Sequence, residues 1–195
     1  MSLRLGIFGG TFDPIHLGHL LLAEFARRLL RLDELVFVPA RIPPHKGKVH
    51  TTPDQRCRMA RLATEDNPHF RVSAVELERS GPSYTIDTLR TLRADGPSAA
   101  EHFLLMGADS ARDLPSWKDH EDLLEESTVA VLNRPGVEVT DFDERVGERV
   151  RLLDTPRIEI SSTEIRRLVR RGESVRYMVT PPVEEFIRSE GLYLS

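Results

Sequence analysis

Short apolar runs alternate with stretches of helical periodicity along almost the whole 195-residue chain. Runs typical of buried strands fall at residues 5–8, 35–38, 70–77, 103–106, 129–132 and 151–153. Between them, apolar residues recur at helical spacing, as in Leu17, Leu21, Phe25 and Leu29, and again in Ile86, Leu89 and Leu92. Because continuous apolar strands that alternate with helices are buried on both faces, this order indicates a parallel sheet.

We therefore expect an α/β fold, with a doubly wound, Rossmann-like parallel sheet and helices on both of its faces. The expected strand order is 3-2-1-4-5. The length is close to that of one compact unit, so residues 1–195 are expected to form a single domain.

The charge balance and the cysteine count exclude several classes of protein. The chain has 27 Lys and Arg against 31 Asp and Glu, a formal net charge of −4, whereas nonspecific nucleic-acid binding depends on excess positive charge. No apolar stretch approaches the roughly 18 residues of a membrane span, and no signal peptide is visible. Cys57 is the single cysteine, so no internal disulfide can form. We expect a cytoplasmic protein that binds neither nucleic acid nor a membrane. The sequence leaves open whether the chain forms a homo-oligomer.

Residues 9–20 (GGTFDPIHLGHL) follow the first predicted strand. Gly9 and Gly10 allow backbone N–H groups to approach a ligand at the carboxyl end of that strand. His16 and His19 are three residues apart at a predicted helix start, so both imidazoles can meet one anion near the positive end of the helix dipole. Gly18 leaves room for the sugar or base of a ligand. Two surface histidines on a capped turn, or two metal ligands, are the alternatives, although no H-E-x-x-H or cysteine cluster is present.

Residues 160–166 (ISSTEIR) predict a second helix start, in which Ser161 and Glu164 form a capping box. Its three hydroxyls and free N–H groups suit a polyphosphate, and Arg166 lies one turn inside the helix, where it can bind phosphate in a bidentate manner. An ordinary amphipathic helix with a solvated basic side is the alternative. Residues 40–52 form a long predicted loop, and loops of this length are often functional. The loop is closed by a predicted helix start at Thr52, Pro53 and Gln55.

The two segments together resemble the H-x-G-H and I-S-S-T-x-x-R signatures of the nucleotidyltransferase superfamily, which transfers AMP or CMP from a nucleoside triphosphate. Within it, the chain resembles the bacterial nicotinate-mononucleotide adenylyltransferase family over nearly its full length. Residues 43–46 (PPHK), 83–89 (SYTIDTL), 107–109 (GAD) with Trp117, and 134–136 (RPG) are similar to motifs of that family. Residues 180–182 and 138–148 depart from its pattern, away from the inferred site.

The resemblance implies transfer of AMP from ATP to nicotinate mononucleotide, which forms nicotinate adenine dinucleotide and pyrophosphate, with Mg²⁺ bound mainly through the ATP phosphates. The implied catalytic residues are His16, His19 and Arg166. The implied ATP-binding residues are Gly9, Gly10, Thr11, Gly107, Asp109, Arg134, Ser161, Ser162 and Thr163. The implied mononucleotide-binding residues are Phe12, His45, Lys46, Thr85 and Trp117.

Several of these residues have individual implied roles. Trp117 would stack on the pyridine ring, Thr85 and nearby N–H groups would bind its carboxylate, and Asp109 would bind a ribose hydroxyl. From the residues alone, core packing of Trp117 and helix capping by Asp109 stay open. Asp13 is expected to fix its loop, because the attacking phosphate is already anionic and needs no base.

Four other classes of protein fit parts of the pattern. Phosphopantetheine adenylyltransferases share both signatures but usually have Thr at the position of His16 and a shorter chain. A nicotinamide-preferring relative, a fragment of a class I aminoacyl-tRNA synthetase and a non-catalytic nucleotide sensor are the others. Intact His16, His19 and Arg166 argue against the sensor. The enzymatic interpretation requires that residues near 16 and near 162 converge on one triphosphate, at the switch in strand order between the first and fourth strands.

Overall fold

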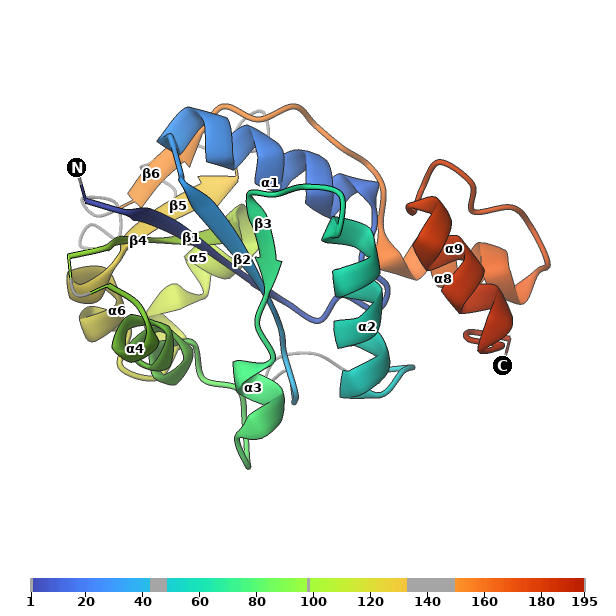
Figure 1. Cartoon of the computed structure of the whole chain (residues 1–195), viewed down its shortest axis with the longest axis horizontal. Helices are drawn as coiled ribbons and strands as arrows, with labels where there is room; N and C mark the ends of the chain where they lie inside the picture. Colours follow the sequence, from blue (N-terminus) through green and yellow to red (C-terminus); the bar gives the residue numbers. More distant parts are fainter. Residues whose placement is uncertain (1, 43–48, 98, 133–149, 195) are drawn as a thin grey trace.

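The computed structural model describes residues 2–42, 49–97, 99–132 and 150–194. In this part of the chain, six strands form one sheet in which every neighbouring pair is parallel. The strands are β1 (Arg4–Gly10), β2 (Glu34–Pro39), β3 (Phe70–Val72), β4 (Glu101–Gly107), β5 (Thr128–Leu132) and β6 (Val150–Leu153). Their order is β3-β2-β1-β4-β5-β6, which confirms the predicted order and adds β6 beside β5 (Figure 1).

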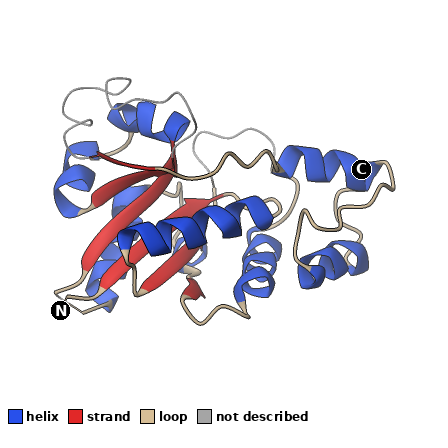
Figure 2. Cartoon of the chain, turned by 90° about the horizontal axis from the view of Figure 1, so that it is seen from above, coloured by secondary structure: helices blue, strands red, loops and turns tan. Residues whose placement is uncertain are grey.

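Helices cover both faces of the sheet, as the alternating sequence pattern predicts (Figure 2). They are α1 (Leu17–Leu30), α2 (Pro53–Thr64), α3 (Val75–Glu78), α4 (Thr85–Asp95), α5 (Ala108–Arg112), the 3₁₀ helix η1 (Leu114–Ser116), α6 (His120–Glu126), α8 (Ser162–Arg170) and α9 (Pro181–Ser189). The helices α8 and α9 lie beyond α2, at the end of the molecule that holds the C-terminus (Figure 1).

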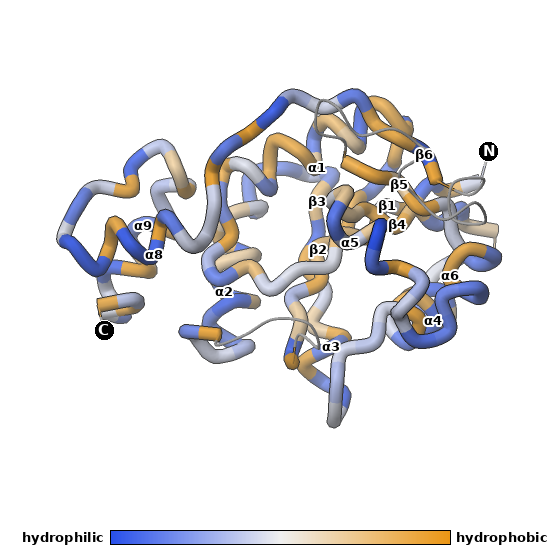
Figure 3. Tube along the Cα trace, turned by 180° about the vertical axis from the view of Figure 1, so that it is seen from behind, coloured by the Kyte–Doolittle hydropathy of each residue, from blue (hydrophilic) through white to orange (hydrophobic). Residues whose placement is uncertain are grey.

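The pleat of the strands divides the interior into two cores, because successive side chains point to opposite faces. Phe8, Phe37 and Phe103 lie in one cluster with residues of α1, α2, α8 and α9. Ile7 and Leu104, their neighbours in sequence, lie in the other cluster with residues of α3 to α6. Figure 3 shows the resulting concentration of hydrophobic residues along the strands. Burial of the strands on both faces accounts for their unbroken apolar runs.

The predicted buried face of α1 is wrong. Leu21 and Leu29 are 47% and 51% exposed, whereas Ala23, Ala26 and Leu30 are buried. The helix turns its small side chains toward the sheet, where they allow a close approach of helix and strands. Periodicity of the leucines alone could not identify this face, because alanine contributes little to the hydrophobic pattern.

The strand predicted over residues 70–77 is shorter in the structure. β3 ends at Val72, and the main-chain N–H groups of Leu77 and Glu78 both donate to the carbonyl of Ala74, which starts α3. Val75 lies in this helical turn, and its side chain is buried. An apolar residue that is typical of a strand therefore packs from a helix at this position.

Local predictions about helix ends and packing are largely confirmed. Thr52 and Gln55 cap the start of α2 reciprocally, with Pro53 in the first turn. Cys57 is buried in α2 and is the free thiol that the sequence predicts. Ile86, Leu89 and Leu92 form the buried face of α4. No helix in the described residues has the length and apolarity needed to cross a bilayer.

Candidate active site

A cleft of about 1090 Å³ opens at the carboxyl ends of the strands. The strands β1 and β4 pair directly, with Phe8 opposite Leu105, and their last residues Gly9, Gly10 and Gly107 line the cleft. β2 and β3 lie on one side of β1, and β5 and β6 lie on the other side of β4. The cleft therefore occupies the switch in strand order, where open α/β sheets bind ligands.

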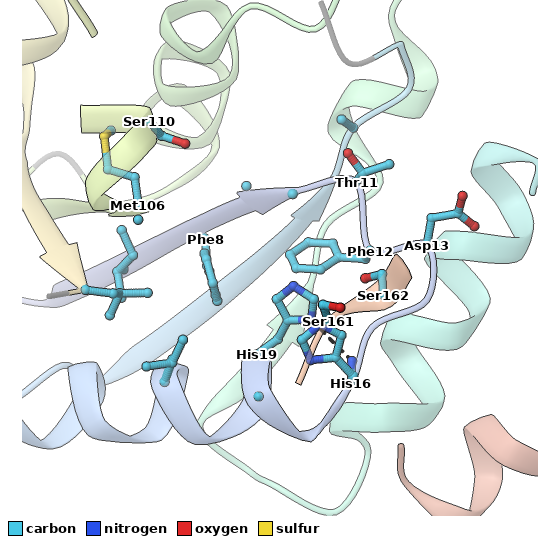
Figure 4. Close-up of a pocket in the computed structure, with 18 of the residues that line it drawn as sticks. Phe8, Thr11, Phe12, Asp13, His16, His19, Met106, Ser110, Ser161 and Ser162 are labelled. Carbon is cyan, nitrogen blue, oxygen red and sulfur yellow. Dashed lines mark hydrogen bonds between the residues drawn. The ribbon is translucent and has the colours of Figure 1, made fainter. Parts of the chain in front are cut away.

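His16 and His19 stand at the start of α1, on the wall of the cleft (Figure 4). Their rings stack with centroids 3.7 Å apart, and the main-chain N–H of His16 donates to Nδ1 of His19 at 3.2 Å. Since Nδ1 of His19 accepts this bond, the neutral ring carries its proton on Nε2. His16 is 6% exposed, and burial lowers its pKa to about 4. The pair therefore combines a neutral His16 with a His19 of fixed tautomer.

Gly18 lines the cleft and also lies close to the histidine pair. A side chain at this position would place its Cβ 3.0 Å from Nδ1 of His16 and 3.3 Å from a methyl group of Ile158. A larger residue would therefore require the imidazole or Ile158 to shift by a few tenths of an ångström. Room for a sugar or base beside Gly18 stays a prediction.

Phe12 lines the cleft but lies mostly in the core behind it. Its ring is 2% exposed and contacts His19 edge-on, with centroids 5.1 Å apart. A Cβ on Gly10 would come within 2.7 Å of the same ring, so glycine at position 10 allows Phe12 to fold back on the loop. Phe12 therefore packs against the His19 ring and supports it from the side of the core.

Residues far apart in sequence meet at this cleft. Ser162 Oγ donates to the carbonyl of Pro14 at 2.9 Å, and Arg166 Nη1 donates to the carbonyl of Asp13 at 2.7 Å. Ser161, Ser162, Thr163 and Arg166 all line the same cleft as the histidines. The predicted convergence of the two signature segments is therefore present in the structure.

The predicted capping box at α8 is formed only in part. Ser161 Oγ accepts the main-chain N–H of Glu164, as expected. The Glu164 carboxylate does not return to the helix start; it accepts a hydrogen bond of 2.7 Å from Arg167. A basic residue one turn later competes for this carboxylate.

Asp13 anchors the signature loop, as predicted, and is 4% exposed. Its carboxylate accepts hydrogen bonds from the main-chain N–H of His50, from Thr51 Oγ1 and from the hydroxyl of Tyr193, at 2.7 to 2.8 Å. These donors come from the loop before α2 and from the C-terminal segment. Asp13 therefore ties three distant segments together beneath the histidines.

The far side of the cleft is formed by the start of α4 and by the segment after α5. Thr85, Tyr84 and Trp117 line it, and Tyr84 and Thr85 stand at the start of α4, where main-chain N–H groups have no partner within the helix. Lys118 lies beside them, with Nζ 4.9 Å from the centre of the Tyr84 ring and 3.1 Å from Asp87, with which it forms an ion pair. The arrangement offers an aromatic ring and a helix N-terminus on one wall of the cleft.

Four predicted residues are not placed in the cleft. Asp109 is outside its lining; its side chain is 83% exposed and lies 3.2 Å from Arg112 Nη1. His45, Lys46 and Arg134 lie outside the described residues. The other predicted site residues line the cleft: Gly9, Gly10, Thr11, Phe12, His16, His19, Thr85, Gly107, Trp117, Ser161, Ser162, Thr163 and Arg166.

The structure adds cleft residues that the sequence did not indicate, among them Glu76 and Arg157. It also shows Arg56, 1% exposed, whose guanidinium donates to the carbonyls of Thr11 and Arg41 at 2.8 and 3.2 Å. Neither Glu76 nor Arg56 belongs to a motif, and a charged residue in a helix normally indicates a solvated face. In the sequence, both residues stand close to apolar residues. This pattern does not distinguish a buried side chain from an exposed one.

Metal ligation by the chain itself finds no support in the described residues. They contain no group of three or more His, Cys, Asp or Glu able to hold a metal ion. His16 and His19 stack on one another rather than diverging around a common centre.

Comparison with known proteins gives consistent results. A family model described as cytidylyltransferase-like matches residues 7–168. A protein of Thermus thermophilus, named "Probable nicotinate-nucleotide adenylyltransferase", is 47% identical over 191 residues, covering 98% of this chain and 100% of its own. A protein of Thermomicrobium roseum with the same name is 46% identical over 196 residues, covering 97% and 91%.

Solved structures resemble the whole fold. The Plasmodium falciparum nicotinic acid mononucleotide adenylyltransferase complexed with NaAD superimposes with a TM-score of 0.78 at 22% identity, over 98% of each chain. A putative nicotinate-nucleotide adenylyltransferase from Vibrio parahaemolyticus gives a TM-score of 0.70 at 21% identity, over 99% of this chain and 96% of its own. At these identities the likeness establishes the fold.

Proposed function

The chain belongs to the cytidylyltransferase-like family and, within it, to the nicotinate-nucleotide adenylyltransferases, and we propose that it joins ATP and nicotinate mononucleotide. The products are nicotinate adenine dinucleotide and pyrophosphate, in the synthesis of NAD. The observation that carries this function is the convergence of the His16 and Arg166 segments on one cleft at the switch in strand order.

The reaction needs charge stabilisation and positioning rather than a nucleophilic side chain. An oxygen of the mononucleotide 5′-phosphate attacks the α-phosphorus of ATP in line. The bond from that phosphorus to the bridging oxygen breaks, and pyrophosphate leaves with the electron pair. Negative charge grows on the equatorial and leaving oxygens, so donors fixed before the reaction are the main requirement.

His16 and His19 are proposed to contact the reacting phosphates. The Nε2–H of His19 is oriented by the main-chain bond to Nδ1, so it can donate to a phosphate oxygen without reorganisation. The positive end of the α1 dipole lies at the same point and adds to the stabilisation. Phe12 holds the His19 ring from behind.

Ser162, Thr163 and Arg166 are proposed to hold the β- and γ-phosphates. Arg166 Nη1 is bonded to the carbonyl of Asp13, and its Nη2 lies 3.3 Å from Thr163 Oγ1, so the guanidinium is already directed to the cleft. Mg²⁺, held by the phosphates because the described residues supply no set of ligands, would neutralise part of the triphosphate charge. The glycines at the ends of β1 and β4 let the backbone approach the nucleotide.

Trp117 and Thr85 are proposed to form the pyridine subsite. Trp117 offers a stacking surface, and Thr85 lies at the first residue of α4, where N–H groups and the helix dipole favour a carboxylate. Lys118 lies nearby, with its charge paired to the Asp87 carboxylate. The helix N-terminus favours the acid over the amide, since an amide carries no negative charge.

The test is an assay of pyrophosphate release with ATP and Mg²⁺. Nicotinate mononucleotide, nicotinamide mononucleotide and phosphopantetheine are supplied separately as acceptors. The proposal predicts rapid release with the nicotinate compound and little with the other two. Rapid release with phosphopantetheine, or the absence of release with all three acceptors, would contradict it.

A further inference from the structure

Glu76 is a buried carboxyl group at the edge of the candidate active site. It lies in α3, is 7% exposed, and lines the cleft together with Ser83, Tyr84 and Thr85. None of the roles proposed above uses it. A carboxyl group is retained in such a place only when hydrogen bonds compensate for the loss of water.

Hydrogen bonds connect Glu76 to the first turn of α4. Thr88 Oγ1 donates to Glu76 Oε1 at 2.7 Å, and Arg79 Nη2 donates to the same Thr88 oxygen at 2.7 Å. Thr88 is 2% exposed, and its main-chain N–H donates to the carbonyl of Tyr84. The carboxyl group therefore fixes the turn that presents Tyr84 and Thr85 to the cleft.

Ser83 links the same segment to the end of β2. Its hydroxyl oxygen accepts the main-chain N–H groups of Arg41 and Ile42 at 3.0 and 3.4 Å, and its own N–H donates to the carbonyl of Ile42 at 3.3 Å. Arg41 is held in turn, because its Nη1 donates to the carbonyls of Leu77 and Arg79 on either side of the end of α3. The segment from 83 to 85 is thus fastened at two places.

Burial raises the pKa of the Glu76 carboxyl group, and the hydrogen bond from Thr88 acts in the opposite direction. Oε2 of Glu76 has no hydrogen-bond partner among the described residues, so the contact of Oε1 with Thr88 is the link between this side chain and α4. An uncharged amide in the same place could accept the same hydrogen bond.

We propose that Glu76 is a positioning residue, which acts through Thr88 to hold residues 83–85 in the geometry that binds the pyridine carboxylate. This inference rests on the proposed function, because that function identifies residue 85 as part of the pyridine subsite. In this role Glu76 acts through the position of α4 and not by direct contact with the substrate. Its loss should weaken binding of the mononucleotide and leave binding of ATP almost unchanged.

The test compares Glu76→Ala and Glu76→Gln, with Glu78→Gln as the matched control on the exposed side of the same short helix. The dissociation constant of nicotinate mononucleotide is measured by quenching of Trp117, the single tryptophan of the chain. KM for each substrate and kcat are measured alongside. Glu76→Ala should raise the dissociation constant and the KM of the mononucleotide about tenfold, at nearly constant KM for ATP.

Glu76→Gln retains an acceptor for Thr88 and should restore mononucleotide binding to within about threefold of the wild type. Thr88→Val and Thr88→Ser give an independent pair if Glu76→Ala does not fold, because serine keeps the donating hydroxyl and valine keeps the shape. Valine should weaken mononucleotide binding and serine should not.

Unchanged binding in both Glu76→Ala and Thr88→Val would overturn the inference, as would equal losses for ATP and the mononucleotide. Loss in Glu76→Gln as large as in Glu76→Ala would also overturn it, since the charge would then be the important property. A wild-type protein that forms no dinucleotide would instead refute the proposed function, so the two failures are distinguishable.

Discussion

The guanidinium of Arg166 donates a hydrogen bond of 2.7 Å to the main-chain carbonyl of Asp13, across 153 positions of sequence. This contact joins the start of α8 to the loop that precedes α1. The Asp13 carboxylate accepts hydrogen bonds from His50, Thr51 and Tyr193. The carbonyl that accepts the hydrogen bond from Arg166 therefore belongs to a residue whose side chain is fixed. The cation that we propose binds phosphate is thereby held in place before ATP arrives.

Replacement of Arg166 by alanine should lower kcat/KM for ATP by about 10²- to 10³-fold, the loss that follows removal of one charge-stabilising donor. Arg167→Ala is the matched control, because Arg167 pairs with Glu164 and does not line the cleft. Steady-state kinetics of both variants test this. Equal losses in the two variants would show that the position of Arg166 has no special role.

Replacement of His19 by alanine should retain the fold and raise the barrier of the transfer step by about 2.7–4 kcal/mol. His19→Gln should recover part of the loss, because the amide nitrogen of glutamine can reach the place of Nε2. Asparagine places its amide nitrogen near Nδ1 and should not recover activity. Single-turnover rates of the three variants check this order; near-normal turnover of His19→Ala would contradict the role.

His16 predicts a pH dependence of stability. Burial lowers its pKa in the folded protein to about 4 from a usual value near 6.5. Between these values the unfolded chain binds a proton that the folded chain does not, so stability is lost as the pH falls from about 6.5 to about 4. The shift corresponds to about 3 kcal/mol.

A His16→Asn variant should not show this loss. Urea unfolding at several pH values between 4 and 7 measures the free energy of unfolding of both proteins. His102, whose pKa burial also lowers, contributes a separate slope that both proteins share. Parallel curves for wild type and variant would show that His16 titrates normally in the folded state.

The buried guanidinium of Arg56 should stabilise the loops that follow β1 and β2. Replacement by methionine leaves the carbonyls of Thr11 and Arg41 without this donor and should cost about 2 kcal/mol, or about 4–8 °C in Tm. Arg58→Met, on the exposed face of the same helix, is the control. Calorimetry measures both changes. An Arg56→Met protein as stable as the wild type would mean that the hydrogen bonds only offset the burial of the charge.

The fold was largely predictable because burial on both sides leaves a continuous apolar run in each strand. The convergence of the 9–20 and 160–166 segments on one cleft was predictable because both segments resemble signatures of one superfamily, and the structure brings them together. The buried face of α1 was not, because Ala23 and Ala26 hardly differ in hydrophobic pattern from their surroundings.

Buried charges were missed for another reason. The partners of Arg56 are main-chain carbonyls of distant residues, and Glu76 is held by a threonine twelve positions away in another helix. Neither partnership leaves a pattern in sequence. The ribose contact of Asp109 stays a prediction; its carboxylate is exposed beside Arg112, next to the cleft residues Gly107 and Ser110.

The most direct test of the account is a crystal structure of the protein with a non-hydrolysable ATP analogue and Mg²⁺. The account predicts the α-phosphate within hydrogen-bond distance of His16 and His19, and the β- and γ-phosphates bound by Ser162, Thr163 and Arg166. A triphosphate that contacts only one of these two segments, or that occupies another cleft, would contradict it.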